Sequence, residues 1–299
     1  MKTPRPQRRA TPARTKSSVR TKRIARIEVL RVDTWSELHA LFDGPRFRDW
    51  AFRGQEDESW PIESSLARAL ARKGIPRTAW RTREERIIRI FRRKAHLLLP
   101  RTPSDFFEWL ALMQHHGAPT RLLDFTWSPY VASFFALDRA TKDAAIWAIL
   151  PSALQSGELA NRLFDRSAVH EDLPIGIHPW NSDRLAEYVL SNRDRWVVVG
   201  EPYHLNRRLI AQSGTFVLPC DNGEPVESLI ASMPGGLDAI KKIVLSTKNL
   251  RETAVRKLYT MNLTHATLFP DLDGLARSMD WELEMDWHPD PRTGRPRRT

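Results

Sequence analysis

The stretch QHHGAPTRLLDFTWSPYVASFFA, residues 114–136, contains two junctions between a helix and a strand. Gly117 stands where a helix would end in a left-handed residue, and a proline two residues later prevents the helix from continuing. Residues 120–126 predict a strand. Ser128 followed by Pro129 predicts the start of a new helix, because serine caps helices and proline fits their first turn. This succession indicates a protein in which helices pack on a central sheet.

The same kind of signal continues on both sides of this stretch. Short apolar runs predict strands near Ile27 and at 50–52, 144–151, 196–202, 214–219 and 241–246. Helices are predicted from Asp33 or Thr34, from Thr82 (a capping box with Glu85) to before Pro100, from Ser104, and over 248–262. Residues 264–282 predict a strand, a loop and a final helix capped by Asp271. Because the order is irregular, we expect an α+β fold with a single mixed sheet and flanking helices.

The composition is that of a globular protein, with 41% apolar and 28% charged residues in a chain of 299. The single cysteine, Cys220, rules out an intramolecular disulfide framework and suits a reducing compartment. No run of about 18 apolar residues predicts a membrane span, and no apolar run follows the basic N-terminus as in a secretory signal. We therefore expect a cytoplasmic protein without a membrane partner.

The net charge of +11 is concentrated at the two ends of the chain. Residues 1–26 contain ten Lys and Arg, and residues 292–299 contain four Arg, with no acidic residue in either segment. Without those fourteen, 33 basic residues remain against 36 acidic ones. We therefore predict a domain over 27–288 between a disordered basic tail (1–26) and a basic C-terminal tail (289–299). The tails are candidates for sequence-independent nucleic-acid binding. The charge runs at 81–89 and 91–94 are interpreted as the solvated face of the first long helix.

Four short motifs occur along the chain: FRGQ at 52–55, QHHGAPTRLLDFT at 114–126, QSGTF at 212–216 and TLFPDLDGLA at 267–276. Together they resemble the FRG domain, a bacterial family named for its Phe-Arg-Gly signature. The resemblance covers about residues 30–280. Because this family has largely been described as a domain of unknown function, it implies a fold more firmly than a reaction.

A second resemblance points to a mechanism. The order AFRG at 51–54, LLDFTWSPYVASFFA at 122–136 and AQSGTF at 211–216 is similar to that of ADP-ribosyltransferases of the Arg-Ser-Glu type. In those enzymes an Arg strand is followed by a Ser-Thr-Ser strand that leads into a helix, and then by a strand or loop bearing Gln or Glu. The resemblance implies an ADP-ribosyltransferase-like fold with NAD as the substrate, consumed by transfer or by glycohydrolysis. Toxin and phage-defence roles are expected by analogy alone.

The resemblance also assigns roles within the expected cleft. Arg53 would hold the diphosphate, because its planar fork of donors suits phosphate oxygens, and Gly54 would let the backbone approach the ligand. Thr126 and Ser128, beside the N–H groups of a helix start, would bind the nicotinamide ribose. The alternative to a ligand-binding role for Arg53 is a purely structural ion pair with Asp124.

The position of the catalytic acid is an open question. Gln212 stands where the transferases carry a carboxylate, and an amide stabilises the positive charge that develops on the ribose far less well. Gln212 would then hydrogen-bond a ribose hydroxyl, or simply satisfy the backbone of a turn. Asp124 and Glu201 are the candidate acids. The acceptor would be a nucleic acid, recruited by the tails, or a protein.

Further candidates lie around the strand 120–126. Thr120, Asp124 and Thr126 fall on one strand face, and His116 is preferred over His115 as a residue lining the pocket. A metal-dependent nuclease using both histidines and Asp124 is disfavoured, because adjacent residues of a helix point about 100° apart. The remaining alternative is a noncatalytic module that binds a ligand or a nucleic acid.

Overall fold

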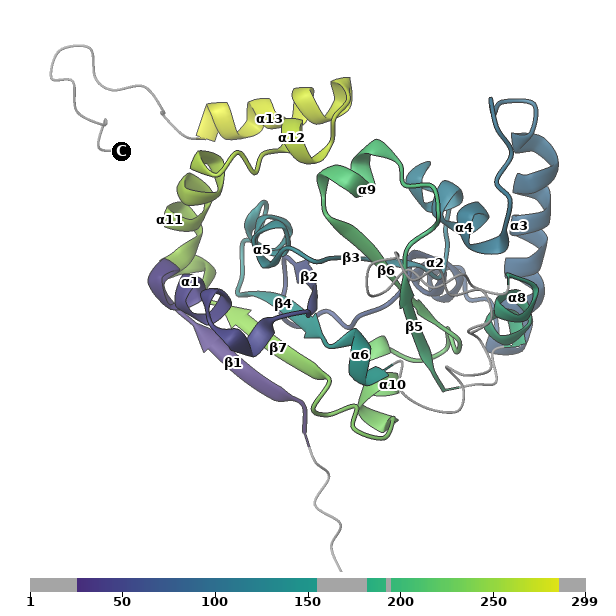
Figure 1. Cartoon of the computed structure of the whole chain (residues 1–299), viewed down its shortest axis with the longest axis horizontal. Coiled ribbons are helices and arrows are strands. Elements are labelled where there is room, and N and C mark those ends of the chain that lie inside the picture. Colours follow the sequence, from purple (N-terminus) through teal and green to yellow (C-terminus); the bar gives the residue numbers. More distant parts are fainter. Residues whose placement is uncertain (1–25, 155–181, 192–194, 285–299) are drawn as a thin grey trace, which may run out of the picture.

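In the computed structural model, residues 26–154, 182–191 and 195–284 are described, and they form a seven-stranded mixed sheet flanked by helices (Figure 1). The strand order is β1-β7-β4-β2-β3-β6-β5. Strands β1 and β7 are parallel, and every other neighbouring pair is antiparallel. The strands are β1 (Glu28–Val32), β2 (Ala51–Gln55), β3 (Leu123–Thr126), β4 (Ala144–Ile149), β5 (Val197–Gly200), β6 (Gly214–Pro219) and β7 (Ile240–Leu245). The expected α+β class with one mixed sheet is confirmed.

The helices pack around this sheet (Figure 1). None of the helices among the described residues is long and apolar enough to cross a membrane. Two short 3-10 turns lie at Pro45–Phe47 and Arg77–Ala79. The helices are α1 (Trp35–Asp43), α2 (Ser65–Arg72), α3 (Trp80–Ala95), α4 (Phe106–His115), α5 (Pro129–Leu137), α6 (Pro151–Leu154), α8 (Ser182–Ser191), α9 (Arg207–Ala211), α10 (Val226–Ser232), α11 (Thr247–Thr260), α12 (His265–Leu268) and α13 (Leu272–Glu284).

Three apolar clusters hold the sheet between its helices. The first packs α1, α5 and α11 against β1, β2, β4 and β7. The second packs α6 and α10 against the alternate side chains of the central strands, and the third joins α3, α4, α8 and α9 to β5 and β6. Because residues i and i+2 of a strand share a face, the second cluster lies on the side of the sheet opposite the other two.

The sheet is not equally paired throughout. Strands β3 and β6 share four residue pairs, and β2 and β4 share five. Strands β2 and β3 are joined by one pair only, Phe52 with Thr126. The two strands therefore separate beyond this pair, and the separation leaves space between the central strands.

Both helix boundaries predicted at 114–136 are confirmed. Gly117 has φ +75°, the left-handed conformation expected after a helix, and α4 ends at His115. Ser128 caps α5 by accepting a hydrogen bond from the N–H of Val131, and Pro129 is the first residue of the helix.

Other predicted boundaries are wrong. Helix α3 begins at Trp80, without a side-chain cap, and not at Thr82, and it ends at Ala95 rather than just before Pro100. The cap of α4 is Asp105, whereas the N–H and hydroxyl of Ser104 bond to the carboxylate of Glu108.

Two predicted strands also differ. The strand expected over 120–126 begins only at Leu123, because the side chain of Thr120 is engaged with Gln114 and that of Arg121 with Glu84. The strand expected within 264–282 is absent from that described segment. Thr264 instead caps the short helix α12, and Asp271 caps α13 as predicted. The two basic tails fall outside the described residues, apart from Arg26.

Candidate active site

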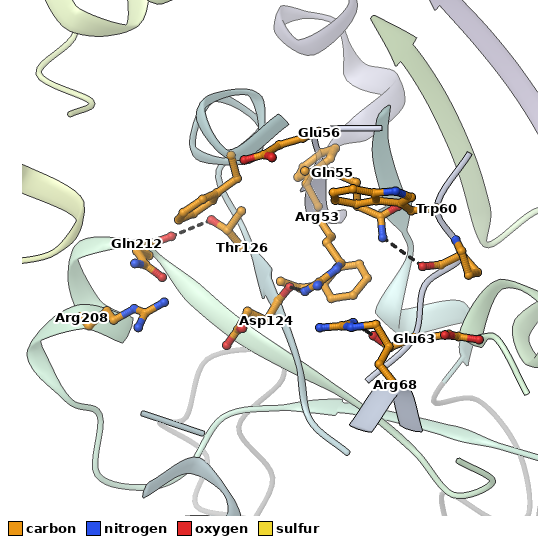
Figure 2. A pocket seen from close by; sticks show the side chains of 15 residues that line it. Arg53, Gln55, Glu56, Trp60, Glu63, Arg68, Asp124, Thr126, Arg208 and Gln212 are labelled. Carbon is orange, nitrogen blue, oxygen red and sulfur yellow. Dashed lines mark hydrogen bonds between the residues drawn. The ribbon is translucent and has the colours of Figure 1, made fainter. Parts of the chain in front are cut away.

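The separation of β2 from β3 opens into a cleft with a volume of about 630 Å³. Pockets of this size hold cofactors and drug-sized ligands. Figure 2 shows the side chains that converge on it from β2, β3, α2 and α9. Of the predicted site residues, five line the cleft: Arg53, Gly54, Asp124, Thr126 and Gln212.

Arg53 lies at the centre of the cleft, on the middle of β2 (Figure 2). Its Nη1 atom donates a hydrogen bond of 2.7 Å to the main-chain oxygen of Asp124, across the gap between the strands. Its Nε atom is buried and has no hydrogen-bond partner among the described residues. Burial lowers the pKa of the guanidinium, and the nearby Asp124 charge partly offsets this effect. A buried cation with an unused donor is suited to an anion that enters from outside.

The expected ion pair between Arg53 and Asp124 takes a different form. The bond runs to the backbone of Asp124, and the Asp124 carboxylate accepts a hydrogen bond of 3.0 Å from Nε2 of Gln114 instead. Asp124 is an exposed residue. Its carboxylate is therefore accessible from the cleft and is held in place by α4.

Two further carboxylates line the cleft, on Glu56 and Glu63. Burial raises the pKa of Glu56, with a smaller contribution from the charge of Asp138. Glu56 follows the last residue of β2 directly, and in Figure 2 it lies across the cleft from Asp124. The cleft thus offers acids on both sides of Arg53.

Two more arginines reach the same cleft. Arg68 comes from α2, and Arg208 from α9, where its guanidinium also lies 4.5 Å from the ring centroid of Phe269. With Arg53, they place three cations around one space (Figure 2). Three guanidinium groups provide the bidentate donors that phosphate oxygens accept.

The exposed aromatic side chain of Trp60 lines the same cleft as these arginines. The side chain of Trp60 is 49% exposed although it lines the cleft. The loop that carries it is held by Gln55, which donates to the main-chain oxygen of Pro61 and accepts from the indole N–H of Trp147. An exposed indole on a fixed loop can stack on a planar ring.

Gly54 has a packing role that sequence reasoning did not anticipate. A Cβ atom at this position would lie 2.0 Å from the main-chain oxygen of Ala132 and 2.6 Å from the nitrogen of Ala136. Gly54 thus lets α5 cross β2 at close range. Gly54 also lines the cleft, so its role in letting the backbone approach a ligand stays a prediction.

The predicted anion site at the start of α5 is already occupied by protein groups. The hydroxyl of Thr126 donates to the main-chain oxygen of Gln212 and accepts from the N–H of Ser128. The Ser128 hydroxyl caps Val131, and Ser128 is not among the residues lining the cleft. The Thr126 hydroxyl thereby joins β3 and the start of α5 to the turn before β6.

Gln212 is buried, and its Nε2 atom donates to the main-chain oxygen of Leu268 at 3.0 Å. The amide therefore attaches α12 to the turn that precedes β6. This supports the interpretation that Gln212 satisfies backbone groups.

Three other predicted site residues do not reach the cleft. Thr120 is buried and donates to Oε1 of Gln114. Glu201 accepts a hydrogen bond of 2.7 Å from the indole N–H of Trp127. His116 caps α4 and is exposed, whereas His115 lines a small adjoining pocket together with Asp124, Arg208 and Gln212. Neither histidine lines the cleft itself, and of the two only His115 lines the adjoining pocket.

Sequence reasoning missed Glu56, Trp60, Arg68 and Arg208. Glu56 follows the FRGQ motif directly, and Arg208 precedes Gln212 by four residues, one turn of a helix. Both could have been found by extending the motifs by a few residues. Trp60 and Arg68 lie in a loop and on α2, and only the tertiary structure brings them to the cleft.

The metal-dependent alternative receives no support. Throughout the described ranges, no three His, Cys, Asp or Glu side chains are grouped as a metal ion would require. His115 and His116 contact each other edge to face, with ring centroids 4.9 Å apart.

Comparison with known proteins identifies one family. Residues 48–145 match the family model of the FRG domain. Residues 48–145 of the chain thus resemble the FRG domain, as the motifs at 52–55 and 114–126 indicated. The matched segment contains every residue found to line the cleft except Arg208 and Gln212. No curated protein and no solved structure gave a significant match.

Proposed function

We propose that the cleft binds NAD and that the protein is an ADP-ribosyltransferase-like enzyme. The supporting observation is the arrangement of the three motif strands. Strands β2, β3 and β6 are consecutive neighbours in the sheet, and their motif residues Arg53, Thr126 and Gln212 line one cleft. These residues are far apart in the sequence, yet the fold brings all three motifs to the same cleft. Their proximity supports a shared role.

The cleft suits the parts of NAD. Arg53, with its unused Nε donor, would bind the diphosphate together with Arg68. Each hydrogen bond to a charged group contributes about 1.5–3 kcal/mol. Trp60 would stack on one of the two rings of the dinucleotide.

The chemical step requires a carboxylate near the ribose. The bond between C1′ of the ribose and the nicotinamide nitrogen breaks, nicotinamide leaves with the bonding electrons, and positive charge develops on the sugar. The nucleophile, an acceptor or water, then forms a bond to C1′ and loses its proton. Gln212 cannot supply negative charge, and Glu201 lies outside the cleft. We assign the stabilising role to Asp124 or Glu56, which lie on opposite sides of Arg53 (Figure 2).

A second candidate function is NAD or nucleotide binding without turnover. The observation that favours it is Gln212, an amide at the position of the expected acid, whose Nε2 atom is engaged with Leu268. The two candidates differ in one result, the release of nicotinamide.

The test uses purified full-length protein and NAD labelled in the nicotinamide ring. Nicotinamide release is measured alone and with DNA, RNA or protein acceptors, and NAD affinity is measured by calorimetry. We expect release by the wild type, its loss in Arg53→Met, and a large decrease in Asp124→Asn or Glu56→Gln. Glu201→Gln is the matched control, because it makes the same acid-to-amide change outside the cleft. Binding without release supports the second candidate, and the absence of both contradicts the proposal.

An NAD-consuming reaction also has a cellular consequence. Expression of the wild type is expected to lower cellular NAD and slow bacterial growth, as a toxin or phage-defence effector would. Arg53→Met is expected to be harmless. Growth arrest by both proteins at normal NAD levels would argue against this role.

A further inference from the structure

Helix α3 exposes a concentrated basic face. At about 100° per residue, Arg83, Arg86, Arg89, Arg93 and Lys94 fall within an arc of about 140°. All five side chains are exposed, and none has an ion-pair partner within the described part of the chain. The same arc contains one apolar residue, Ile90. The opposite face packs into the protein through residues such as Trp80 and Ile88.

The acidic residues of α3 do not neutralise this face. Glu84 is buried and paired with Arg121, and Glu85 is paired with Arg81 at 2.8 Å. The helix contributes seven cations and two acids to a body in which Lys and Arg otherwise do not outnumber Asp and Glu. The five cations therefore form a positive surface without ion-pair partners among the residues that the structure describes.

Further basic residues lie in the sequence between the cleft and the basic face of α3. Arg68 lines the cleft from α2, and Arg72 follows it one turn later on the same helix. Lys73 and Arg77 lie in the connection to α3, and the side chains of these last three residues are exposed. Basic residues thus occur along the segment that connects the cleft to α3.

A groove of about 430 Å³ runs beside the basic face, between α3 and α8. Ile88, Phe106 and Leu190 provide apolar lining, and Arg89, Arg92 and Arg93 line the same groove. An apolar slot beside several guanidinium groups suits a planar base attached to a phosphate backbone.

We propose that the α3 face binds nucleic acid, with phosphates on its arginines and an unpaired base in the adjoining groove. Four of the five cations are arginines, which bind phosphate oxygens in a bidentate manner. The charge runs at 81–89 and 91–94 would then be a binding surface rather than only the solvated face of a helix. It also names the acceptor class of the proposed transfer, and for that role it rests on the proposed function. Binding itself is measured without NAD, so each idea can fail separately.

The test must separate α3 from the basic tails. It therefore uses a full-length background in which the ten Lys and Arg of residues 1–26 and the four Arg of 292–299 are replaced by Gln. In this background, the test variant carries Arg86→Gln, Arg89→Gln and Arg93→Gln. The matched control carries Arg48→Gln, Lys248→Gln and Lys257→Gln, three exposed cations on other elements. Both variants lose the same net charge.

Fluorescence anisotropy is measured from 50 to 200 mM salt with labelled 20-nucleotide single-stranded DNA, the corresponding duplex, and RNA of the same sequence. We expect the background to bind, with the single strands preferred because their bases are unpaired. The α3 variant should lose roughly tenfold or more in affinity, and its salt slope should fall by about 2 to 3. The control should remain close to the background.

Three results would overturn the inference. The first is no binding by the background protein, and the second is an equal loss in the test and control variants. The third is preferential binding to poly-glutamate or to anionic phospholipid vesicles, which would assign the face to a protein or a membrane partner. Equal unfolding free energies of the two variants exclude a folding defect as the cause of lost binding.

Discussion

Arg121 and Glu84 form a buried ion pair that joins the segment before β3 to α3. Their side chains are 0% and 3% exposed, and the Arg121 Nε atom lies 2.7 Å from Oε1 of Glu84. Arg121 also donates to the main-chain oxygens of Pro219 and Cys220 at 3.0 and 3.1 Å. This pair therefore has the structural role that was considered for Arg53 and Asp124, which are joined only through the Asp124 backbone.

Breaking this pair is expected to destabilise the protein strongly. Either Glu84→Gln or Arg121→Met leaves one charge buried without its partner, which costs about 3–5 kcal/mol. The free energy of unfolding in urea measures the effect. Glu85→Gln is the control, because its pair with Arg81 is exposed and contributes less than about 1 kcal/mol. Equal losses of unfolding free energy in Glu84→Gln and Glu85→Gln would show that burial does not determine how much the Arg121–Glu84 pair stabilises the protein.

Arg53→Met is expected to separate stability from binding. The change removes one hydrogen bond from a charged group, worth about 1.5–3 kcal/mol, and this loss is offset because a buried charge with an unused donor is removed as well. We therefore expect the free energy of unfolding to stay within about 1 kcal/mol of the wild type. NAD affinity should fall at least tenfold. A loss of several kcal/mol in urea unfolding would instead assign Arg53 to the fold.

Gly54→Ala is expected to be among the most damaging small substitutions. The added methyl group would lie 2.0 Å from the main-chain oxygen of Ala132, so α5 or β2 must move. Overpacking of this kind costs about 1–3 kcal/mol or more. Gly44→Ala is the control, because its nearest neighbour would lie 3.5 Å away and its φ of −73° suits alanine. The proposal about α5 fails if both variants melt at the wild-type temperature.

The stability difference between Glu56→Gln and the wild type is expected to depend on pH. Burial raises the pKa of Glu56 above its ordinary value of 4.5, so the folded protein binds its proton more tightly than the unfolded chain does. The associated stability is therefore present below about pH 4.5 and is lost as the pH rises through the folded pKa. Glu56→Gln should be the more stable protein at pH 7, and this advantage should shrink toward pH 4. A variant that is less stable at pH 7 would contradict this prediction.

Local signals predicted much of the fold. Gly117 and Ser128 mark helix ends through backbone conformation and capping, which depend on a few adjacent residues. Thr82 and Ser104 failed as caps because tertiary packing decided where α3 and α4 begin. The single pairing of Phe52 with Thr126, which creates the cleft, has no local signature, because it depends on how β2 and β3 separate in the folded sheet.

The candidate site was predictable in part for the same reason. Arg53, Asp124 and Gln212 lie in recognisable motifs, and the structure brings them to one cleft. Glu201 and Thr120 were polar residues beside apolar strands, but their hydrogen bonds are made to Trp127 and Gln114. Sequence alone could not distinguish polar groups that are already engaged from those that remain accessible.

The close crossing of α5 over Gly54 changes what the Phe-Arg-Gly signature can be taken to mean. Its glycine sets the distance between a helix and a strand, a requirement that holds whatever ligand the cleft receives. Related chains can therefore keep the signature while their chemistry diverges. The informative positions for comparing their activities are those equivalent to Glu56, Arg68 and Arg208, where side chains reach the cleft from outside the contact between Gly54 and α5.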